Sequence, residues 1–269
     1  MRGMSPLLAS TVNQVIIRHP SLRWPIPDLL IKVLPRSRLS VLRRRAKYIL
    51  AEFVDNHNQL LGTLILHLGM SGRICLLEKN EVPAKHDHFE MHFDGGQLLR
   101  LRDPRRFGAV LWVDGKDSVE NHPLIKSLGP EPLEETFTGD YLYQQMRTRT
   151  APIKTTIMDG HLVVGVGNIY ASESLFRAGI SPSISANKVS PRKCERLVKE
   201  IKTTLAAAIQ AGGSSLRDFF GADGNPGYFQ QTYFVYGRTN QPCLVCGTQI
   251  RQIKQGQRST FYCPKCQRR

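Results

Sequence analysis

CLVC at residues 243–246 and CPKC at residues 263–266 are the stretches that decide how the C-terminal part of the chain folds. Each C-x-x-C pair can offer two thiolates from one tight turn, and two such turns complete a tetrahedral metal site. The spacing therefore predicts one structural zinc ion held by Cys243, Cys246, Cys263 and Cys266, with no position left open for catalysis. Two disulfides or a redox pair are alternatives, and so is iron, because spacing alone does not choose the metal.

The segment between the two cysteine pairs is basic. It contains RQIKQGQRSTFY at residues 251–262, which combines Arg, Lys and Gln with two aromatic residues. A metal site would hold this segment rigid, so we expect a function that depends on where the segment is placed.

The whole chain of 269 residues carries a large positive charge. Its 37 Lys and Arg residues against 22 Asp and Glu give a formal net charge of +15. A solvated basic surface is one interpretation, but an imbalance this large is typical of proteins that bind a polyanion. Nucleic acid is favoured over a membrane, because the sequence has no long apolar run and no amphipathic basic tail. The start lacks the apolar stretch of a signal peptide, and Cys75 and Cys194 are expected to be buried or incidental thiols in a reducing cytosol.

Residues 1 to about 130 have the pattern of short strands separated by turns. The expected strands lie within residues 41–53, 63–68, 86–93, 97–102 and 107–113. Asp94-Gly95 predicts a hairpin turn, and the stretch from Gly69 to Gly72 predicts a tight turn. Several short strands of this kind predict a β-sandwich or a barrel.

From about residue 138 the apolar period becomes helical. We expect helices over residues 140–147 and 169–178, the second ended by Gly179. A third helix should begin at Ser190-Pro191, with serine as N-cap and proline at the first helical position, and end at Gly212-Gly213. The chain is thus divided into a β domain over residues 1–130, a helical domain over 131–232 and a zinc module over 233–269, with a proline-rich join at 128–132.

Three motifs have the residue types needed for binding phosphates or DNA. Two glycines, Gly165 and Gly167, precede a predicted helix and can bring backbone N–H groups to a phosphate, although an ordinary loop would also explain them. Arg105 and Phe107 can enter a duplex, with the ring wedged where a base has left; a surface turn with a core Phe is the alternative. Lys47 follows three arginines in a strand-like run, where a solvated basic strand is the simpler explanation.

These motifs occur together in one chain. In order they are RRAKY at 44–48, HLGMSG at 67–72, KHDH at 85–88, DPRRFG at 103–108, GVGNIYA at 165–171, PGYF at 226–229 and QRSTFYC at 257–263. In this combination the sequence resembles bacterial formamidopyrimidine-DNA glycosylases, from about Gly3 to the C-terminus. The resemblance implies an α+β multidomain fold: an N-terminal β-sandwich, a helical helix-two-turns-helix domain and a C-terminal zinc finger, with DNA between the domains.

The implied activity is base-excision repair of damaged double-stranded DNA. Such enzymes remove oxidised purines, namely 8-oxoguanine and formamidopyrimidines, and then cut the strand by β,δ-elimination. By the resemblance, Lys47 is the proton donor in β-elimination and Arg258 the proton donor in δ-elimination. Extruding a damaged base costs a few kcal/mol, and a wedge that fills the vacancy offsets part of that cost.

Further roles follow from the resemblance alone. Met70, Arg105 and Phe107 match the side chains that fill the gap, with Arg105 pairing to the orphaned opposite base, preferentially cytosine. DNA-backbone contacts near the lesion are expected from His86, Arg149, Lys154 and Asn168. The segment from Arg217 to Tyr228 corresponds to a loop that closes over the extruded base. The protein is expected to act as a monomer in the bacterial cytoplasm, at the nucleoid, with one zinc ion.

The N-terminus departs from the family pattern. Family members begin, after methionine removal, with Pro-Glu-Leu-Pro-Glu-Val-Glu, and the terminal proline amine is the nucleophile. Residues 1–4 of this sequence align about ten residues further in, and the internal Pro6 has an amide nitrogen that cannot replace the nucleophile. Either the protein made by the cell is longer and active, or this is a shortened paralogue that binds lesions without excising them. We favour the first, because the elimination donors, the gap-filling residues and the zinc ligands are all present.

A zinc-ribbon transcription or ribosome factor is a third class of function. It would leave Arg105, Phe107 and the stretch from Gly165 to Asn168 without a role. Such a factor would show a sequence preference without a preference for damage, whereas all three classes predict strongly salt-dependent binding.

Overall fold

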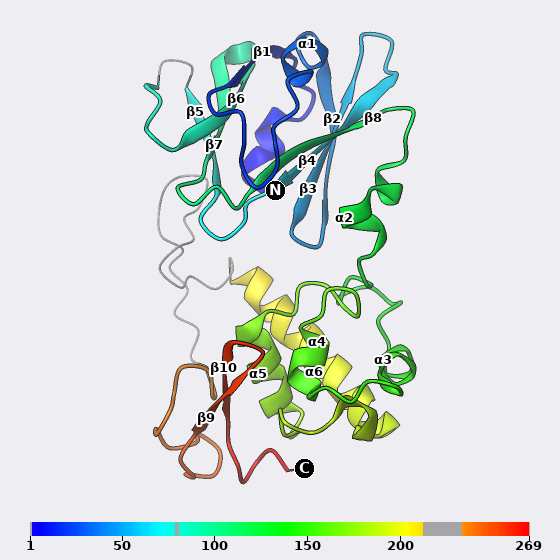
Figure 1. Cartoon of the computed structure of the whole chain (residues 1–269), viewed down its shortest axis with the longest axis vertical. Coiled ribbons are helices and arrows are strands. Elements are labelled where there is room, and N and C mark those ends of the chain that lie inside the picture. Colours follow the sequence, from blue (N-terminus) through cyan, green and yellow to red (C-terminus); the bar gives the residue numbers. More distant parts are fainter. Residues whose placement is uncertain (1, 79–80, 212–232, 269) are drawn as a thin grey trace. The chain divides into compact units, whose positions relative to one another are not determined.

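The structure, a computed structural model, describes residues 2–78, 81–211 and 233–268 (Figure 1). Within these residues the chain forms two compact units, and the boundary lies between Lys126 and Ser127. Unit 1 consists mainly of strands, and unit 2 of helices and a small two-stranded sheet, each around its own core. None of the described helices is long and apolar enough to span a membrane.

Unit 1 has two antiparallel sheets of four strands each in its described part. Their orders are β2-β3-β4-β8 and β1-β6-β7-β5. The strands are β1 (Val12–Ile17), β2 (Arg38–Arg45), β3 (Tyr48–Val54), β4 (Leu60–His67), β5 (Arg73–Glu78), β6 (Asp87–Phe93), β7 (Gln97–Arg102) and β8 (Ala109–Asp114). Short helical segments flank them: the 3-10 helix η1 (Arg2–Leu7), α1 (Leu30–Val33) and α2 (Pro123–Lys126).

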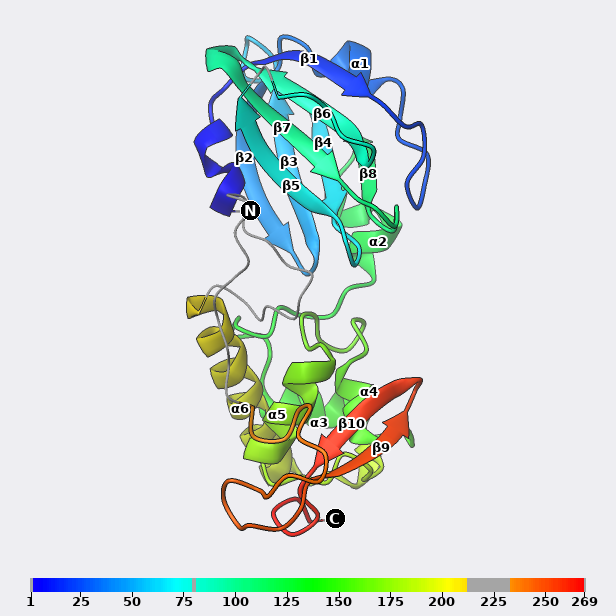
Figure 2. The same cartoon turned by 90° about the vertical axis from the view of Figure 1, so that its left-hand side faces the viewer.

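The two sheets pack face to face and overlie one another in Figure 2. Phe53 and Leu64 from one sheet share a core with Phe89 and Leu101 from the other, and all four are fully buried. Burying β-branched, aromatic and leucine side chains from both inner faces is what stabilises a sandwich. The predicted β-sandwich is confirmed.

The turns predicted at Asp94-Gly95 and at Gly69 to Gly72 are present, and a third turn, at Lys47, differs from the prediction. Gly95 and Gly96, with φ of 74° and 81°, form the turn between β6 and β7, as Asp94-Gly95 predicts. Lys47, however, does not lie in a strand: it follows Ala46, whose φ is 53°, in the two-residue turn between β2 and β3. Two-residue hairpins favour a positive φ, which alanine seldom adopts, so the sequence gives little sign of this turn.

Unit 2 is a helical bundle with a zinc module attached. Its elements are α3 (Gly139–Met146), α4 (Ile153–Ile157), α5 (Asn168–Arg177), α6 (Pro191–Gln210), β9 (Arg251–Gln255) and β10 (Arg258–Tyr262). Helix α6 packs against α3 and α5, around a core that includes Leu142, Leu175 and Leu197. The expected helices are present, and Gly179 takes a φ of 62° just after α5.

Helix α6 begins as its sequence predicts. The Oγ of Ser190 accepts a hydrogen bond from the backbone N–H of Lys193, and Pro191 is the first helical residue. Four of the five apolar residues at helical spacing are buried, namely Leu197, Val198, Ile201 and Leu205, whereas Ile209 is exposed. The predicted end at Gly212-Gly213 lies outside the described residues.

A buried carboxylate fixes the start of the zinc module to helix α5. The side chain of Glu173 accepts hydrogen bonds from three consecutive backbone N–H groups, those of Phe234, Val235 and Tyr236, at 2.9, 3.0 and 2.9 Å. In both views the β9–β10 hairpin lies beside α5, which β10 contacts (Figures 1 and 2). The zinc module and the helices are therefore packed against one another within unit 2.

Candidate nucleic-acid interface and metal centre

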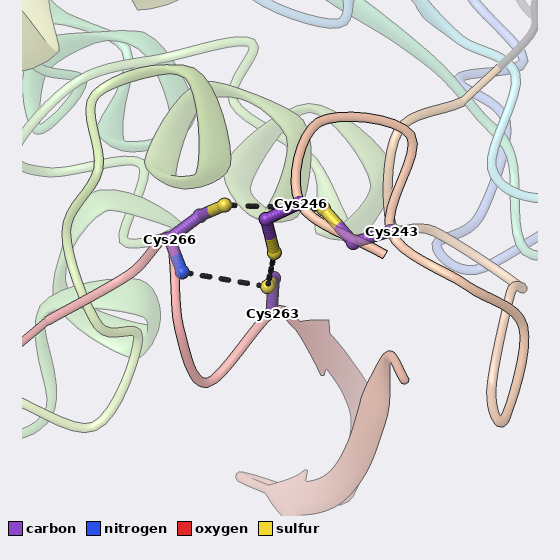
Figure 3. A group of neighbouring side chains, drawn as sticks. All are labelled: Cys243, Cys246, Cys263 and Cys266. Atoms are coloured by element: carbon purple, nitrogen blue, oxygen red, sulfur yellow. Dashed lines mark hydrogen bonds between the residues drawn. The ribbon is translucent and has the colours of Figure 1, made fainter. Parts of the chain in front are cut away.

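The four cysteines of the zinc module converge on one point (Figure 3). Their Sγ atoms all lie within 4.8 Å of one another, with 3.9 Å between Cys243 and Cys266 and 3.5 Å between Cys246 and Cys263. Four thiolates about 2.3 Å from a zinc ion stand about 3.8 Å apart at tetrahedral angles. The donor set and its spacing therefore fit one structural zinc ion with a complete set of protein ligands.

Thiol chemistry at this cluster supports a metal over a disulfide. All four cysteines are free, and their sulfur atoms are much further apart than the roughly 2.05 Å of a disulfide. Gly247, with φ of 71°, lets its N–H turn back to the carbonyl of Cys243 at 2.9 Å.

Arg258 is presented at the tip of the β9–β10 hairpin. The two-residue turn has positive φ at both positions, 51° at Gly256 and 63° at Gln257. A turn of this kind matches the twist of the strands and fixes their register, so Arg258 pairs with Gln255 and opens β10. The Arg258 side chain is exposed, and its guanidinium is available to an anion.

Lys154 joins this hairpin to the helices. It lies in α4 and is only 1% exposed. Its Nζ donates hydrogen bonds to Oδ1 of Asn168 at 2.5 Å, the carbonyl of Ser259 at 3.0 Å and Oγ1 of Thr260 at 2.7 Å. Burial, and then the charge of Arg258, lower the pKa of the Lys154 ammonium to about 8. The three hydrogen bonds described for this ammonium group all go to acceptors within the protein.

Asn168 stands at the N-terminus of helix α5. The preceding Gly165 has a φ of 79°, and Gly167 is an N-cap without a capping side chain. A Cβ on Gly167 would meet nothing within 4 Å, so the space before the helix is open. Backbone N–H groups at such an end, beside a half-buried amide, can receive a phosphate oxygen.

Arg149 adds a cation to the helical part of unit 2. Its Nη1 forms an ion pair with Oδ2 of Asp159 at 2.8 Å. Burial alone would raise the pKa of the Asp159 carboxyl, but the hydrogen bond from Arg149 helps to lower it. The half-exposed guanidinium is thereby held in a defined orientation, which limits the entropy that binding an anion costs.

Two connections between the sheets of unit 1 lie side by side. Residues 68–72 link β4 to β5, and residues 103–108 link β7 to β8. A Cβ on Gly69 would stand 2.6 Å from the backbone carbon of Phe107, so the two connections are in contact. Gly69 also has a φ of 60°, and both observations explain why glycine occupies this position.

The tips of these connections bring three predicted site residues together. Met70 is 59% exposed and Phe107 is 45% exposed, which is unusual for large apolar side chains. The exposed guanidinium of Arg105 lies over the ring of Phe107, with 4.7 Å from Cζ to the ring centroid. This arrangement, a cation stacked on an exposed ring beside an exposed methionine, is suited to insertion between bases.

Asp103 holds the backbone beneath these three residues. Its buried carboxylate accepts hydrogen bonds from Oγ of Ser71 at 2.7 Å and from the N–H of Gly108 at 2.8 Å. The Ser71 oxygen in turn accepts from the N–H of Arg105 at 3.3 Å. Both connections are therefore fixed through one carboxylate, while the side chains at their tips remain exposed.

Lys47 lies at the same end of the β2-β3-β4-β8 sheet. Its exposed side chain follows β2, and His67 ends β4, where it pairs with Tyr48 across the strands and contacts its ring. Burial lowers the pKa of the His67 imidazole, and the charges of Lys47 and Arg23 lower it further. Two cations, Lys47 and Arg23, therefore lie near this imidazole, and their charges suit the binding of a phosphate.

His86 is joined by its backbone to the same region. It directly precedes β6, and its carbonyl accepts a hydrogen bond from the N–H of Asp103 at 3.0 Å. The ring is half-buried and stands 6.4 Å from that of His88. The two remaining predicted residues, Arg217 and Tyr228, lie outside the described residues.

The sequence alone assigns no function to three residues that hold the site segments in place. They are His67, Asp103 and Glu173, each of which lies within a motif that carries the resemblance or within two residues of one. Their motifs point to the right places. The roles themselves depend on partners in distant parts of the chain, as the bonds from Phe234 to Tyr236 onto Glu173 show.

Three family models match successive parts of the chain. Residues 1–110 match the formamidopyrimidine-DNA glycosylase N-terminal domain, and residues 128–220 match the H2TH domain of the same glycosylase. Residues 240–269 match a zinc finger found in FPG and IleRS.

Individual proteins match the chain along nearly all of its length. A formamidopyrimidine-DNA glycosylase of Methylobacillus flagellatus is 63% identical over 266 residues, which cover 99% of this chain and 92% of that protein. The Lactococcus lactis Fpg protein bound to DNA with an abasic site is 30% identical, with a TM-score of 0.87 over 100% of this chain and 96% of that one. The same Fpg bound to DNA with N7-benzyl-Fapy-dG is 31% identical, again with a TM-score of 0.87 and the same coverage.

Proposed function

The chain belongs to the formamidopyrimidine-DNA glycosylase family, and from this premise we propose how its residues act. The protein is a DNA glycosylase of base-excision repair that acts on oxidised purines in double-stranded DNA. A base in a duplex is out of reach of an active site until it leaves the stack, at a cost of a few kcal/mol. The side chains that offset this cost are therefore central to the function.

The observation that carries the proposal is the exposed group formed by Met70, Arg105 and Phe107. We propose that Phe107 and Met70 fill the space left by the extruded nucleotide, where stacking on neighbouring bases replaces their contact with water. Arg105, stacked on Phe107, would donate hydrogen bonds to the opposite base, preferentially cytosine. Fixation of their backbone by Asp103 supports this role, because side chains that are placed before binding cost less entropy.

We propose that abasic-site lyase activity follows base removal. Lys47 would donate a proton in β-elimination and Arg258 in δ-elimination. Each lies at or next to a two-residue hairpin turn with an exposed side chain, which supports a role at the DNA strand. The position of His67 beside Lys47 supports a phosphate contact at the same place.

Contacts with the DNA backbone are assigned to His86, Arg149 and Asn168. For Asn168 the open helix N-terminus supports phosphate binding. Lys154 would contribute mainly from beneath, because its amine is buried against Asn168 and the β9–β10 hairpin. Arg217 and Tyr228 are proposed to belong to a loop over the extruded base, by the resemblance alone.

One structural zinc ion is held by Cys243, Cys246, Cys263 and Cys266. When bound, it supplies coordination that keeps the small module folded. The β9–β10 hairpin, and with it Arg258, then stays in place against α4 and α5. We further propose that the protein works as a monomer in the bacterial cytoplasm, at the nucleoid, where its DNA substrate is.

The test uses an end-labelled duplex with one 8-oxoguanine opposite cytosine. Protein with the family's Pro-Glu-Leu-Pro-Glu start ahead of residue 3 is assayed beside residues 1–269, since the resemblance assigns the nucleophile to that terminal proline. From the protein with this start we expect release of the base and a one-nucleotide gap with phosphates at both ends, and no cutting of the undamaged duplex. Borohydride should trap a covalent complex of that protein by reducing an iminium intermediate.

A second function would be revealed by the same duplexes. Tight and damage-specific binding by both proteins, without base release or trapping, would identify a non-catalytic lesion or abasic-site binder. Binding that depends on sequence but not on damage would contradict both proposals. Arg105→Ala is the matched variant: as the contact to the opposite base is lost, preference for cytosine over adenine should fall about tenfold or more.

A further inference from the structure

The connection between β5 and β6 is exposed, yet a buried arginine holds its backbone. In the described part of this loop, residues 81–85 are exposed. Arg100, within β7 and only 1% exposed, donates from Nη2 to the carbonyl of Glu81 at 2.7 Å and from Nη1 to the carbonyl of Val82 at 3.3 Å. A guanidinium presents its N–H groups in a rigid planar fork, so two neighbouring carbonyls bound to it have little freedom.

Buried carboxylates fix the orientation of Arg100. Its Nε donates to Oε1 of Glu90 at 2.7 Å, and its Nη1 lies 3.5 Å from Oδ2 of Asp87. Glu90 also receives two hydrogen bonds from Arg18, at 2.9 and 2.8 Å, and Asp87 receives two from Arg102, at 2.5 and 2.9 Å. Burial would raise the pKa of both carboxyls, but the bonds from the arginines outweigh it and lower both.

Stability alone does not account for so many buried charges. Removing charges from water costs several kcal/mol per ion, and well-packed apolar side chains of similar volume are often as stabilising as a buried ion pair. A buried network of this kind can instead determine a unique geometry. The exposed residues Glu81 and Val82 are the part of the surface whose backbone geometry this network determines.

The same network continues to His86. Oδ2 of Asp87 accepts from the N–H of Ala84 at 2.7 Å, and the N–H of Asp87 donates back to the carbonyl of Ala84 at 3.0 Å. The carbonyl of His86 is bound by the N–H of Asp103. The loop backbone is therefore held at four positions, two of them by Arg100, and Lys85 and His86 lie at its end.

We propose that Arg100 is a positioning residue for DNA binding, which fixes the 81–86 loop so that Lys85 and His86 meet DNA phosphates. The inference rests on the proposed function, since it assumes that these two side chains face the DNA backbone. Arg100 touches no substrate itself. It acts through the carbonyls of Glu81 and Val82.

The test compares Arg100→Lys with Arg43→Lys. Arg43 is a control in the same unit, because it also joins two carboxylates, Glu52 at 3.2 Å and Glu120 at 2.9 Å, although its side chain is partly exposed. Lysine keeps the positive charge at both positions but lacks the planar set of N–H donors that a guanidinium has. Affinity for a duplex containing a tetrahydrofuran abasic analogue is measured from 50 to 300 mM salt, and thermal unfolding checks the fold.

Arg100→Lys should weaken binding about five- to tenfold and reduce the slope of log K against log salt by about one, the loss of one phosphate contact. Arg43→Lys should leave both unchanged. The rate of base release at saturating DNA, measured in protein with the family's Pro-Glu-Leu-Pro-Glu start, should change less than about threefold in either variant, since the affected contact is to the backbone. In a background with Lys85→Ala and His86→Ala, Arg100→Lys should have no further effect on the slope.

Two results would overturn the inference: a folded Arg100→Lys protein with the unchanged slope, or a slope loss that persists in the background lacking Lys85 and His86. If Arg100→Lys does not fold, insertion of one glycine between Val82 and Pro83 replaces it, because this separates the carbonyls that Arg100 holds from Lys85 and His86 and lies outside both strands. An unchanged slope in that variant equally overturns the inference. Failure of the proposed function is distinguishable, because base release from the 8-oxoguanine duplex would then be absent, whereas the comparison of salt slopes requires only binding.

Discussion

The two units hold their expected DNA-contacting residues by opposite electrostatic means. In unit 1 a buried carboxylate, Asp103, accepts hydrogen bonds from Ser71 and Gly108. In unit 2 a buried ammonium, Lys154, donates to Asn168 and to the carbonyl of Ser259. Each centre lies under exposed side chains, and each joins segments that are far apart in the sequence.

The difference follows from how much regular structure supports the DNA-contacting segments in each unit. The connections of unit 1 cross between two large sheets that already share a core, so one carboxylate suffices to join them through the Ser71 hydroxyl and the Gly108 N–H. The β9–β10 hairpin has two short strands, too few for independent stability. It therefore depends on Lys154, on the Glu173 carboxylate and on the metal site together.

Removing the metal should have the largest effect and should be confined to unit 2. Chelation, or Cys246→Ala, removes coordination that contributes on the order of 10 kcal/mol to folding of small zinc modules. Zinc content should fall from one ion per chain, and amide hydrogen exchange should accelerate throughout residues 240–268. Cys75→Ala, outside the cluster, should retain the ion. Equal loss of protection in unit 1 would show that the units are not supported separately.

Lys154→Met should remove a pH dependence that arises from the buried amine of unit 2. The folded-state pKa of Lys154, about 8, lies below the 10.5 of the unfolded chain, so the unfolded chain binds more protons between these values. Lys154 should therefore contribute a rise of up to about 3 kcal/mol in the free energy of unfolding across that window, which the difference between the unaltered protein and Lys154→Met isolates. Denaturant unfolding at pH 7.5 and pH 10 measures the rise. The exposed Lys199→Met is the control, and an identical rise in Lys154→Met would contradict the assignment.

A comparison of Gly69→Ala with Gly95→Ala tests the contact between the connections at residues 68–72 and 103–108 of unit 1. Both glycines have a positive φ, 60° and 74°, so alanine costs about 1–2 kcal/mol at either position. Only at Gly69 would the new Cβ meet backbone, 2.6 Å from Phe107, and overpacking of this kind adds about 1–3 kcal/mol. We expect the larger loss of stability, and the only loss of lesion binding, in Gly69→Ala. Equal losses of stability in the two variants would mean that the backbone at Phe107 moves away from the new Cβ at little cost.

Phe107→Ala should have the smallest effect on stability and a clear effect on binding. The side chain is 45% exposed, so the free energy of unfolding should change by less than about 1 kcal/mol. Binding to the damaged duplex should fall about tenfold, since stacking on a base contributes about 1–3 kcal/mol. Leu133→Ala, equally exposed but in unit 2, should leave binding unchanged. A large loss of stability in Phe107→Ala would assign the ring to the core.

The parts of the fold that were predictable from sequence depend on short-range patterns. The zinc ligands lie in two local pairs, the turn at Asp94-Gly95 is set by two residues, and helix α6 starts where Ser190 and Pro191 indicate. In each case the energy that fixes the conformation is available within a few neighbouring residues.

The supporting contacts were not predictable in this way. Lys154 finds its acceptors 105 and 106 residues further along the chain, and Arg18 meets Glu90 at a separation of 72. The composition of such segments gives no sign of the partner. Lys47 was misplaced for a different reason: alanine at a positive φ opposes the local preference, and only the pairing of β2 with β3 imposes it.

The two-residue turns beneath Lys47 and Arg258 also limit how the chain can vary in length. A side chain in a strand changes face with every residue, so one inserted residue at Ala46 or Gly256 would turn the following strand over unless a bulge absorbed it. Insertions and deletions in relatives of this protein should therefore be absent from both hairpin tips. They should accumulate in connections such as residues 115–122, where length is not tied to the register of a sheet.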